Sequence, residues 1–300
     1  MDEQTTHKPA PRMALIGFGE AGGGFARAAG WKTARGWDVL AARRAAMAVQ
    51  GVLAGASPAD ALADAQCVLS LVTADAALNA ARDYAPLMPP RALWLDMNSI
   101  APATKRAAAE AVLAAGGRYV DVAVMAPVDN SANGALAVPL LLAGPDADEA
   151  QELLAALGFN NIRIVGDEVG RASAIKLCRS VMVKGLEALT AEMVLAAAEA
   201  GVVDEVLDSL DASEKSISWR TRADYNLDRM LIHGRRRSAE MAEAAQMLQD
   251  LGMEPRMNEQ TVRWQAELGE LGLAPPPEGL RAKLDAIRAT PGFGGENKNP

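Results

Sequence analysis

Short apolar runs alternate with alanine-rich amphipathic stretches through the first half of the chain. The apolar runs predict β-strands at 13–17, 37–42, 67–73, 92–97, 118–125, 136–144 and 161–166. The stretches between them predict helices, among them 20–32, 57–65 and 102–117. Ser57 and Pro58 suit the cap and first position of the second of these helices. Strands that alternate with helices form right-handed βαβ units, so this half predicts a doubly wound, mainly parallel α/β sheet covered on both faces.

The pattern changes after Gly166, where strand-like runs stop. One helix is predicted from residue 170 to Gly201, and further helices continue to about residue 289. These differences predict a loose tail at 1–11, an α/β domain at 12–165, an all-helical domain at 166–290 and a flexible tail at 291–300. The helical domain, which begins with the long interdomain helix, is expected to bind substrate and to form a homodimer.

Composition narrows the class of protein. The chain has 300 residues, of which 50% are hydrophobic, so it can bury a sizeable core. A formal charge of −8 argues against a nucleic-acid binder, and the longest basic run, 235–237, is too local for a nucleic-acid track. The sequence has neither an apolar stretch of membrane-spanning length nor a signal-peptide core, which predicts a cytoplasmic protein. Cys67 and Cys178 are isolated, so neither a disulfide framework nor a metal site is expected.

Glycines gather directly after the first predicted strand. "GFGEAG" at 17–22 follows the strand and opens a helix. Glycine allows a tight turn and a close backbone approach, and the N–H groups of a helix start attract phosphate. A glycine turn alone is weak, but the strand–turn–helix context with a second strand about fifteen residues later favours a Rossmann-type dinucleotide site. Its predicted cofactor-binding residues are Gly17, Phe18, Gly19, Glu20, Ala21 and Gly22.

Two arginines bear on the choice of dinucleotide. Arg43 and Arg44 follow the predicted strand at 37–42, and a guanidinium matches the 2′-phosphate of NADP in charge and geometry. The other interpretation is a solvated basic helix start, which the positive end of the helix dipole disfavours. We therefore predict NADP ahead of NAD, with NADPH bound at least about tenfold tighter, because a charged phosphate pair contributes about 1.5–3 kcal/mol.

Several ordered motifs together resemble the β-hydroxyacid dehydrogenases, which include 6-phosphogluconate, 3-hydroxyisobutyrate and tartronate-semialdehyde enzymes and have imine reductases as relatives. "GFGEAG" is similar to their cofactor turn, "LVTAD" at 71–75 to the segment beside the cofactor, and "DMNSIAP" at 96–102 to the stretch beside the nicotinamide. "DVAVMAPVDNSANGAL" at 121–136 is similar to their substrate segment. "GRASAIK" at 170–176 has the spacing that delivers their catalytic lysine. The resemblance implies that Val72, Thr73 and Asn98 bind the cofactor and that Lys176 is catalytic.

Lys176 lies in the long predicted helix. Helical spacing places it on a polar stripe with Ser173 and Ser180, opposite an apolar stripe that includes Ile175, Cys178, Met182 and Leu189. We therefore expect a mostly buried helix whose polar stripe faces a cleft. The alternative is a surface lysine, the commoner fate of this residue. With the resemblance, Lys176 is expected to move the proton of the substrate oxygen during hydride transfer, while Asn98 orients nicotinamide or substrate, or else caps a helix.

The chain departs from this family at its substrate segment. Related enzymes hold a substrate carboxylate with serine–glycine–glycine, where this chain has Met125, Ala126 and Pro127. Proline has no N–H to donate, so we expect an apolar pocket floor and a bulkier, less acidic substrate than a small hydroxyacid. Further predicted substrate residues are Asn98, Arg179, Ser180, His233, Arg236 and Arg237. The alternative for the last three is a solvated helix start after Gly234.

The sequence thus predicts an NAD(P)-dependent oxidoreductase that acts on the carbonyl or hydroxyl carbon of a small-molecule substrate. One alternative within this class is an imine reductase, and another is oxidation followed by decarboxylation of a β-keto acid. The rival class is a dinucleotide-binding sensor or scaffold without turnover, because fold does not decide activity. A sensor would have no need of a lysine at the nicotinamide.

Overall fold

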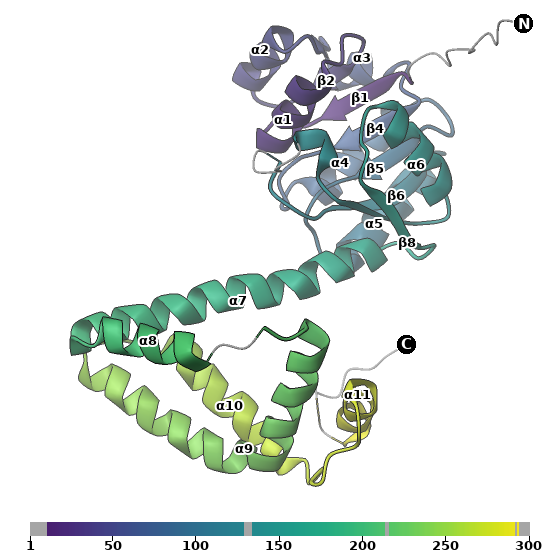
Figure 1. Cartoon of the computed structure of the whole chain (residues 1–300). Coiled ribbons are helices and arrows are strands. Elements are labelled where there is room, and N and C mark those ends of the chain that lie inside the picture. Colours follow the sequence, from purple (N-terminus) through teal and green to yellow (C-terminus); the bar gives the residue numbers. More distant parts are fainter. Residues whose placement is uncertain (1–10, 129–133, 214–215, 292, 294–300) are drawn as a thin grey trace, which may run out of the picture. The chain divides into compact units, whose positions relative to one another are not determined.

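A computed structural model describes residues 11–128, 134–213, 216–291 and 293 of the chain (Figure 1). It divides into two compact units, one that runs to Val181 and one that begins at Met182. This division lies inside a long helix, later than the boundary at 165/166 predicted where the strands stop. The tails predicted at 1–11 and 291–300 fall largely outside the described residues.

The first unit is built on one eight-stranded sheet. Its strands are β1 (Met13–Ile16), β2 (Arg35–Trp37), β3 (Leu53–Ala54), β4 (Cys67–Ser70), β5 (Leu93–Asp96), β6 (Arg118–Val124), β7 (Leu140–Ala143) and β8 (Ile162–Gly166). Their order is β3-β2-β1-β4-β5-β6-β7-β8, and every neighbouring pair is parallel except β6 and β7. The chain runs outward from β1 to β3 and then returns to β4 on the other side of β1. The switch point between β1 and β4 is where open sheets of this kind bind ligands, at the carboxyl ends of their strands.

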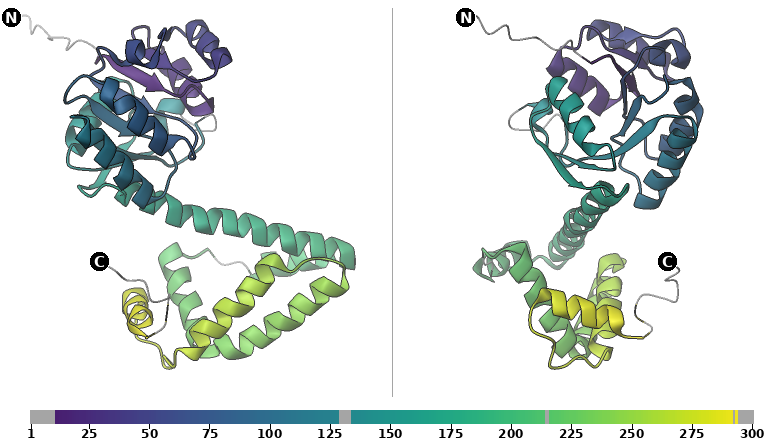
Figure 2. Two further views of the ribbon diagram at one scale, coloured as in Figure 1. Left: turned by 180° about the vertical axis from the view of Figure 1, so that it is seen from behind. Right: turned by 90° about the vertical axis from the view of Figure 1, so that its right-hand side faces the viewer.

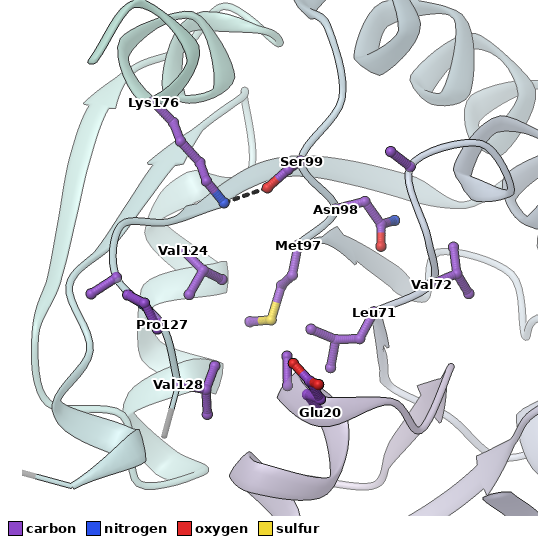
Figure 3. Close-up of a pocket in the computed structure, with 13 residues that line it drawn as sticks. Glu20, Leu71, Val72, Met97, Asn98, Ser99, Val124, Pro127, Val128 and Lys176 are labelled. Carbon is purple, nitrogen blue, oxygen red and sulfur yellow. Dashed lines mark hydrogen bonds between the residues drawn. The ribbon is translucent and has the colours of Figure 1, made fainter. Parts of the chain in front are cut away.

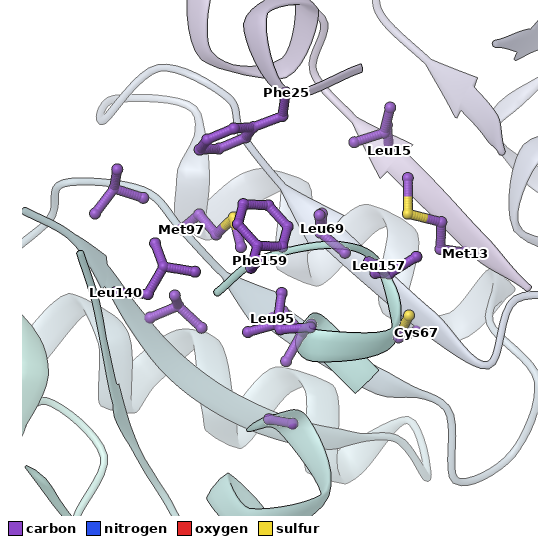
Figure 4. Packing of buried hydrophobic residues seen from close by; sticks show 14 of the residues in the cluster. Met13, Leu15, Phe25, Cys67, Leu69, Leu95, Met97, Leu140, Leu157 and Phe159 are labelled. Carbon is purple, nitrogen blue, oxygen red and sulfur yellow. The ribbon is translucent and has the colours of Figure 1, made fainter. Parts of the chain in front are cut away.

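Helices cover both faces of this sheet (Figure 1, Figure 2). One face carries α1 (Glu20–Ala29), α2 (Ala41–Val49) and α6 (Ala147–Ala156), and the other carries α3 (Pro58–Leu62), α4 (Ala77–Tyr84) and α5 (Pro102–Ala114). Figure 4 shows the core under the first face, where the rings of Phe25 and Phe159 meet edge to face with centroids 5.0 Å apart. Strands β1, β4 and β5 are buried along their whole length, as expected of strands covered on both sides.

The predicted doubly wound, mainly parallel sheet is confirmed, with two local differences. The strand predicted at 37–42 is wrong, because β2 ends at Trp37 and α2 begins at Ala41. Val39 and Leu40 are 73% and 60% exposed, so their apolar character does not reflect burial in a strand. The run at 136–144 contains the short strand β7 after a 3₁₀ turn (Ala135–Ala137), and β7 pairs antiparallel with β6.

All the regular elements described in the second unit are helices. Its elements are the remainder of α7 (Arg171–Ala200), α8 (Val203–Ser213), α9 (Trp219–Asp250), α10 (Arg256–Glu270) and α11 (Leu280–Ala289). Helices α9 and α10 touch at Gly234, where a Cβ would lie 2.2 Å from the carbonyl oxygen of Gln265. Gly234 is therefore interior to α9, and the alternative of a helix start after it is wrong. Lys283 attaches α11 to α9 through Asp224 at 2.6 Å and Asp228 at 2.9 Å.

The faces of α7 differ from the sequence prediction. Its apolar stripe is not buried within the chain, because Ile175, Met182 and Leu189 are 36%, 46% and 44% exposed. Ser173, from the predicted polar stripe, is buried instead. The reason is a carboxylate of the sheet that binds the first turn of the helix, as described below. No helix among the described residues is long and apolar enough to cross a membrane.

Candidate functional site

The turn after β1 forms one wall of the candidate site. Gly17 has φ +91° and donates its N–H to the carbonyl oxygen of Trp37 at 2.9 Å. A Cβ on Gly17 would lie 2.5 Å from the carbonyl oxygen of Leu71, so both the backbone conformation and this contact require glycine. Helix α1 begins at Glu20, and no side chain caps it at Gly19. An uncapped helix start after a tight glycine turn is a favourable place for a pyrophosphate.

A carboxylate follows β2 at the same edge of the sheet. Oδ2 of Asp38 accepts the N–H of Phe18 in the glycine turn at 2.8 Å, and its Oδ1 accepts the N–H of Leu40 at 2.8 Å. In Rossmann folds, an acidic residue about twenty positions after the glycine turn binds the ribose hydroxyls of NAD. The sequence prediction missed Asp38 because it extended the strand past this residue.

The predicted phosphate-binding arginines lie in the first turn of α2. Arg44 donates to the carbonyl oxygens of Asp38 and Val39 at 2.7 and 3.0 Å, and its guanidinium lies 4.7 Å from the ring centroid of Trp37. Arg43 is exposed. The first turn of α2 has neither an acidic residue nor a side-chain cap. This edge of the sheet therefore presents two cations beside one carboxylate.

A cavity of about 600 Å³ lies where β4, β5 and β6 end, next to the start of α1 (Figure 3). Its lining is Glu20, Ala21, Leu71, Val72, Ala74, Met97, Asn98, Ser99, Val124, Ala126, Pro127, Val128 and Lys176. Most of these side chains are apolar. The four polar ones carry the chemistry that the cavity can perform.

Lys176 extends from the second turn of α7 toward the segment after β5. Its Nζ donates to Oγ of Ser99 at 2.5 Å. Figure 3 shows this pair on one side of the cavity and the carboxylate of Glu20 on the other. Ser99 was missed by the sequence prediction, although it is the neighbour of Asn98 in "DMNSIAP". Lys176 is half-buried and lines the cavity.

The side-chain amide of Asn98 is hydrogen-bonded through its nitrogen but not through its oxygen. It is 4% exposed, and its Nδ2 donates to Oδ1 of Asp96 at 2.8 Å and to Oγ of Ser70 at 2.9 Å. Its Oδ1 is buried without a hydrogen-bond partner. A buried acceptor without a partner costs about 1–3 kcal/mol, so this oxygen is suited to receive a donor from a ligand in the cavity.

The structure brings several predicted residues to this cavity and leaves others outside it. Those that line it are Glu20, Ala21, Val72, Asn98, Ala126, Pro127 and Lys176. Met125 does not form the predicted pocket floor. It packs against a buried cluster formed by Ala123, Leu141, Ala143 and Ala172, because successive residues along an extended chain point to opposite sides and Val124 takes the cavity side. Thr73, Arg179 and Ser180 are also absent from the lining.

The predicted substrate residues on α9 belong to the second unit. His233 and Arg237 are half-buried there and Arg236 is exposed. A substrate contact by these three side chains stays a prediction.

Two further observations concern metal-ligating and thiol side chains among the described residues. No three His, Cys, Asp or Glu side chains gather there as a metal site would require. Burial raises the pKa of the Cys67 thiol to about 12, so this cysteine is not a thiolate near neutral pH.

Known proteins share both the sequence pattern and the fold. The NAD binding domain of 6-phosphogluconate dehydrogenase matches residues 12–166, and a domain of unknown function, DUF1932, matches residues 197–268. A conserved hypothetical protein from Sinorhizobium meliloti 1021 is 37% identical, with 94% of each chain covered and a TM-score of 0.58.

Two further solved structures extend this likeness. The conserved protein MTH1747, of unknown function and described as similar in structure to 3-hydroxyacid dehydrogenases, is 29% identical over 92% of this chain and 99% of its own, with a TM-score of 0.56. A reductive aminase from Aspergillus terreus, in complex with NADPH and ethyl levulinate, shares the fold at a TM-score of 0.68 and 20% identity, covering 93% and 99% of the two chains. The glycine turn, the switch-point cavity and a match over more than half of the sequence agree, and the chain belongs to the family of the 6-phosphogluconate dehydrogenase NAD-binding domain.

Proposed function

We propose that this protein transfers hydride between a nicotinamide dinucleotide and a carbonyl or hydroxyl carbon, with Lys176 as general acid and base. An NAD(P)-dependent oxidoreductase of the hydroxyacid dehydrogenase and imine reductase type is supported by the family match and by the structural neighbours. One observation carries the finer assignment. Nζ of Lys176, Oγ of Ser99 and the unpartnered Oδ1 of Asn98 belong to one cavity at the carboxyl ends of parallel strands.

The residues present fit a dinucleotide. Gly17 admits a close backbone approach, the uncapped α1 suits a pyrophosphate, and Oδ1 of Asn98 matches the N–H donors of a nicotinamide carboxamide. When bound, the nicotinamide supplies or accepts the hydride. The apolar lining from Leu71 and Met97 would keep water from the reacting atoms.

Lys176 carries the proton in this proposal. Hydride addition to a carbonyl carbon builds negative charge on its oxygen, which the Lys176 ammonium neutralises and protonates. In the reverse direction the neutral amine removes the hydroxyl proton. Ser99 orients Nζ through its hydroxyl, so the lysine approaches the substrate oxygen in a defined direction.

The cavity floor bears on the substrate class. Pro127 has no N–H, and Val124, Ala126 and Val128 offer no side-chain donor to a carboxylate. We therefore expect poor turnover of 3-hydroxyisobutyrate and tartronate semialdehyde and better turnover of bulkier, less acidic carbonyl compounds. Absorbance of the reduced cofactor with a panel of both classes checks this. Ordinary enzymatic efficiency with the small hydroxyacids would contradict the inference from the floor residues.

Imine reduction is the second candidate, and Glu20 favours it. Its carboxylate lines the cavity opposite Lys176, where it would attract the positive charge of an iminium ion. The same panel, with a ketone alone and with the ketone plus an amine, separates the two reactions. A dinucleotide-binding sensor or scaffold would bind cofactor and turn over neither. Oxidation with decarboxylation would release carbon dioxide from a β-hydroxyacid.

Cofactor choice depends on opposing charges at the adenosine end. Arg43 and Arg44 support NADPH, as the sequence predicted, whereas Asp38 supports the ribose hydroxyls of NADH and would repel a 2′-phosphate. We propose that the chain binds both cofactors with NADPH ahead. Asp38→Asn is expected to raise the preference for NADPH, and Arg43→Ala to lower it, each by about tenfold since a charged pair is worth about 1.5–3 kcal/mol. Fluorescence titration measures both ratios, and unchanged ratios would contradict the assignment.

A homodimer through the helical unit is also proposed. Helix α7 exposes Met182, Val183, Leu186, Leu189 and Leu195, and a second copy of the chain would remove these apolar side chains from water. We expect light scattering to report a dimer at micromolar concentration. Met182→Glu with Leu189→Glu should shift the mass toward a monomer. A monomeric parent protein across that range would rule the proposal out.

A further inference from the structure

A fully buried lysine joins two strands beneath the cavity. Lys105 of α5 is 0% exposed, and its Nζ donates to the carbonyl oxygen of Asp96 at 2.5 Å and to its Oδ1 at 3.0 Å. The same Nζ lies 3.2 Å from Oδ1 of Asp121. Asp96 and Asp121 are paired in register on β5 and β6 and are both 0% exposed. The Lys105 ammonium therefore lies between two adjacent buried carboxylates, which would repel each other without it.

Asp96, the first of the two carboxylates, binds Asn98 at one side of the cavity. Oδ1 of Asp96 accepts the backbone N–H of Asn98 at 2.9 Å as well as its Nδ2. Oδ2 accepts the hydroxyl of Tyr119 at 2.7 Å. Burial, with the charge of Asp96, raises the pKa of Tyr119 well above its usual value, so the tyrosine stays a donor. These bonds fix the amide of Asn98 with its Oδ1 left for a ligand.

Asp121, the second carboxylate, accepts hydrogen bonds from the start of α7. Oδ2 of Asp121 accepts the N–H groups of Gly170 at 3.1 Å and Ser173 at 2.9 Å. Its Oδ1 accepts the hydroxyl of Ser173 at 2.7 Å. Lys176 follows Ser173 by about one helical turn, on the same side of the helix. The point at which the Lys176 side chain leaves the helix is therefore set by Asp121.

We propose that Lys105, Asp121 and Ser173 are positioning residues for Lys176 and Asn98. Buried ion pairs add little net stability, because desolvation offsets their attraction and apolar residues are often at least as stable. A buried network whose carboxylate oxygens all accept hydrogen bonds does give a unique geometry. Here that geometry carries the two polar groups of the cavity that the proposed reaction uses. The assignment of Lys176 as acid and base rests on the proposed function, but its position does not.

Ser173→Ala tests the contact between Asp121 and the first turn of α7, which positions Lys176. Two further variants accompany it. Ser173→Thr keeps the hydroxyl and should rescue the effect. Ser57→Ala, which removes the side-chain cap of α3 at the N–H of Asp60 in the same unit, is the control for loss of a serine hydroxyl hydrogen bond away from the cavity. The first readout is the rate at which acetic anhydride acylates Lys176, quantified by peptide mass spectrometry, which requires no substrate. The second is kcat with any substrate that the parent accepts.

We expect Ser173→Ala to change the acylation rate of Lys176 by about fivefold, which corresponds to the free energy of one hydrogen bond. Ser99→Ala should change this rate in the same direction. Ser173→Ala should lower kcat by about tenfold or more, since a displaced catalytic group loses up to about 10²-fold, with little change in the cofactor Kd. Ser57→Ala should change neither. Parent-like acylation in a folded Ser173→Ala protein overturns the proposal. Altered acylation with parent-like kcat supports the positioning role and contradicts Lys176 as the acid.

Lys105→Met tests the centre of the network and keeps the volume of the side chain. If it folds, it should change Lys176 acylation at least as much as Ser173→Ala and weaken NAD(P)H binding through Asn98. Folded Lys105→Met protein with parent-like acylation and cofactor binding would also overturn the proposal. If it does not fold, the Ser173 variants decide the question alone.

Discussion

Replacing Lys176 by methionine is expected to lower turnover by about a hundredfold or more while leaving NAD(P)H binding nearly unchanged. A positioned acid that protonates the developing oxyanion contributes about 10²–10⁴-fold to such a reaction. Methionine keeps the bulk of the side chain but removes the ammonium that bonds to Ser99. The cofactor is expected to bind to the glycine turn and the sheet, which this substitution does not touch.

The measurement is steady-state turnover with a substrate that the parent accepts, together with fluorescence titration of NAD(P)H. Lys184→Ala is the control, because residue 184 lies about two turns further along α7 and should matter far less. Lys176→Ala should behave like Lys176→Met. If the Lys176 variants turn over like the parent, the proton has another source, and His233 would be the next residue to replace.

Gly234→Ala is expected to destabilise the helical unit by about 3 kcal/mol, the upper end of the usual cost of overpacking. A Cβ at this position would lie 2.2 Å from the carbonyl oxygen of Gln265 and 2.8 Å from Cα of Gly269. These are backbone atoms of α10, which cannot rotate away as a side chain would. Helices α9 and α10 would have to separate along their contact, and their packing around Leu231 and Leu268 would loosen.

Urea unfolding followed by far-ultraviolet circular dichroism measures this loss. Gly185→Ala is the matched control, since Gly185 is also helical but its Cβ would meet nothing within 4 Å. That substitution should be neutral or stabilise the chain by up to about 1 kcal/mol, because alanine favours helix over glycine. Equal unfolding midpoints for the two variants would show that α9 and α10 do not touch at Gly234 in solution.

The sequence predictions of caps, helix ends and turns are confirmed where residues a few positions apart determine the structure. Ser57 caps α3 by accepting the N–H of Asp60 at 3.1 Å, and Gly201 ends α7 with φ +71°. The turn at Gly17 follows from the same kind of rule. Each depends on residues a few positions apart, so the sequence contains the whole reason.

Two sequence predictions are wrong because the predicted positions differ from the observed ones by one or a few residues. The predicted second strand continues past Trp37 and therefore includes Asp38, which was not recognised as a ligand-binding candidate. An acidic residue about twenty positions after a glycine turn is a pattern that could have identified it. The prediction of Met125 in the pocket floor is wrong because side chains alternate along β6, so Val124 lines the cavity and Met125 packs against a buried cluster on the other side. In both cases a shift of one or a few residues changed which side chain faces the ligand.

The sequence by itself determined the alternation of strands and helices in the first unit, the place of the glycine turn and the class of cofactor, because periodicity and turn residues act locally. Only the tertiary structure decided what surrounds the reactive groups. Lys176 and Ser99 are 77 residues apart, and they meet because α7 starts beside the end of β5. Lys105, in an alanine-rich helix, has the pattern of a surface lysine, yet it is fully buried. The reason is that a buried charge is stabilised by partners on other elements, here two aspartates on adjacent strands, and strand pairing is what brings them together.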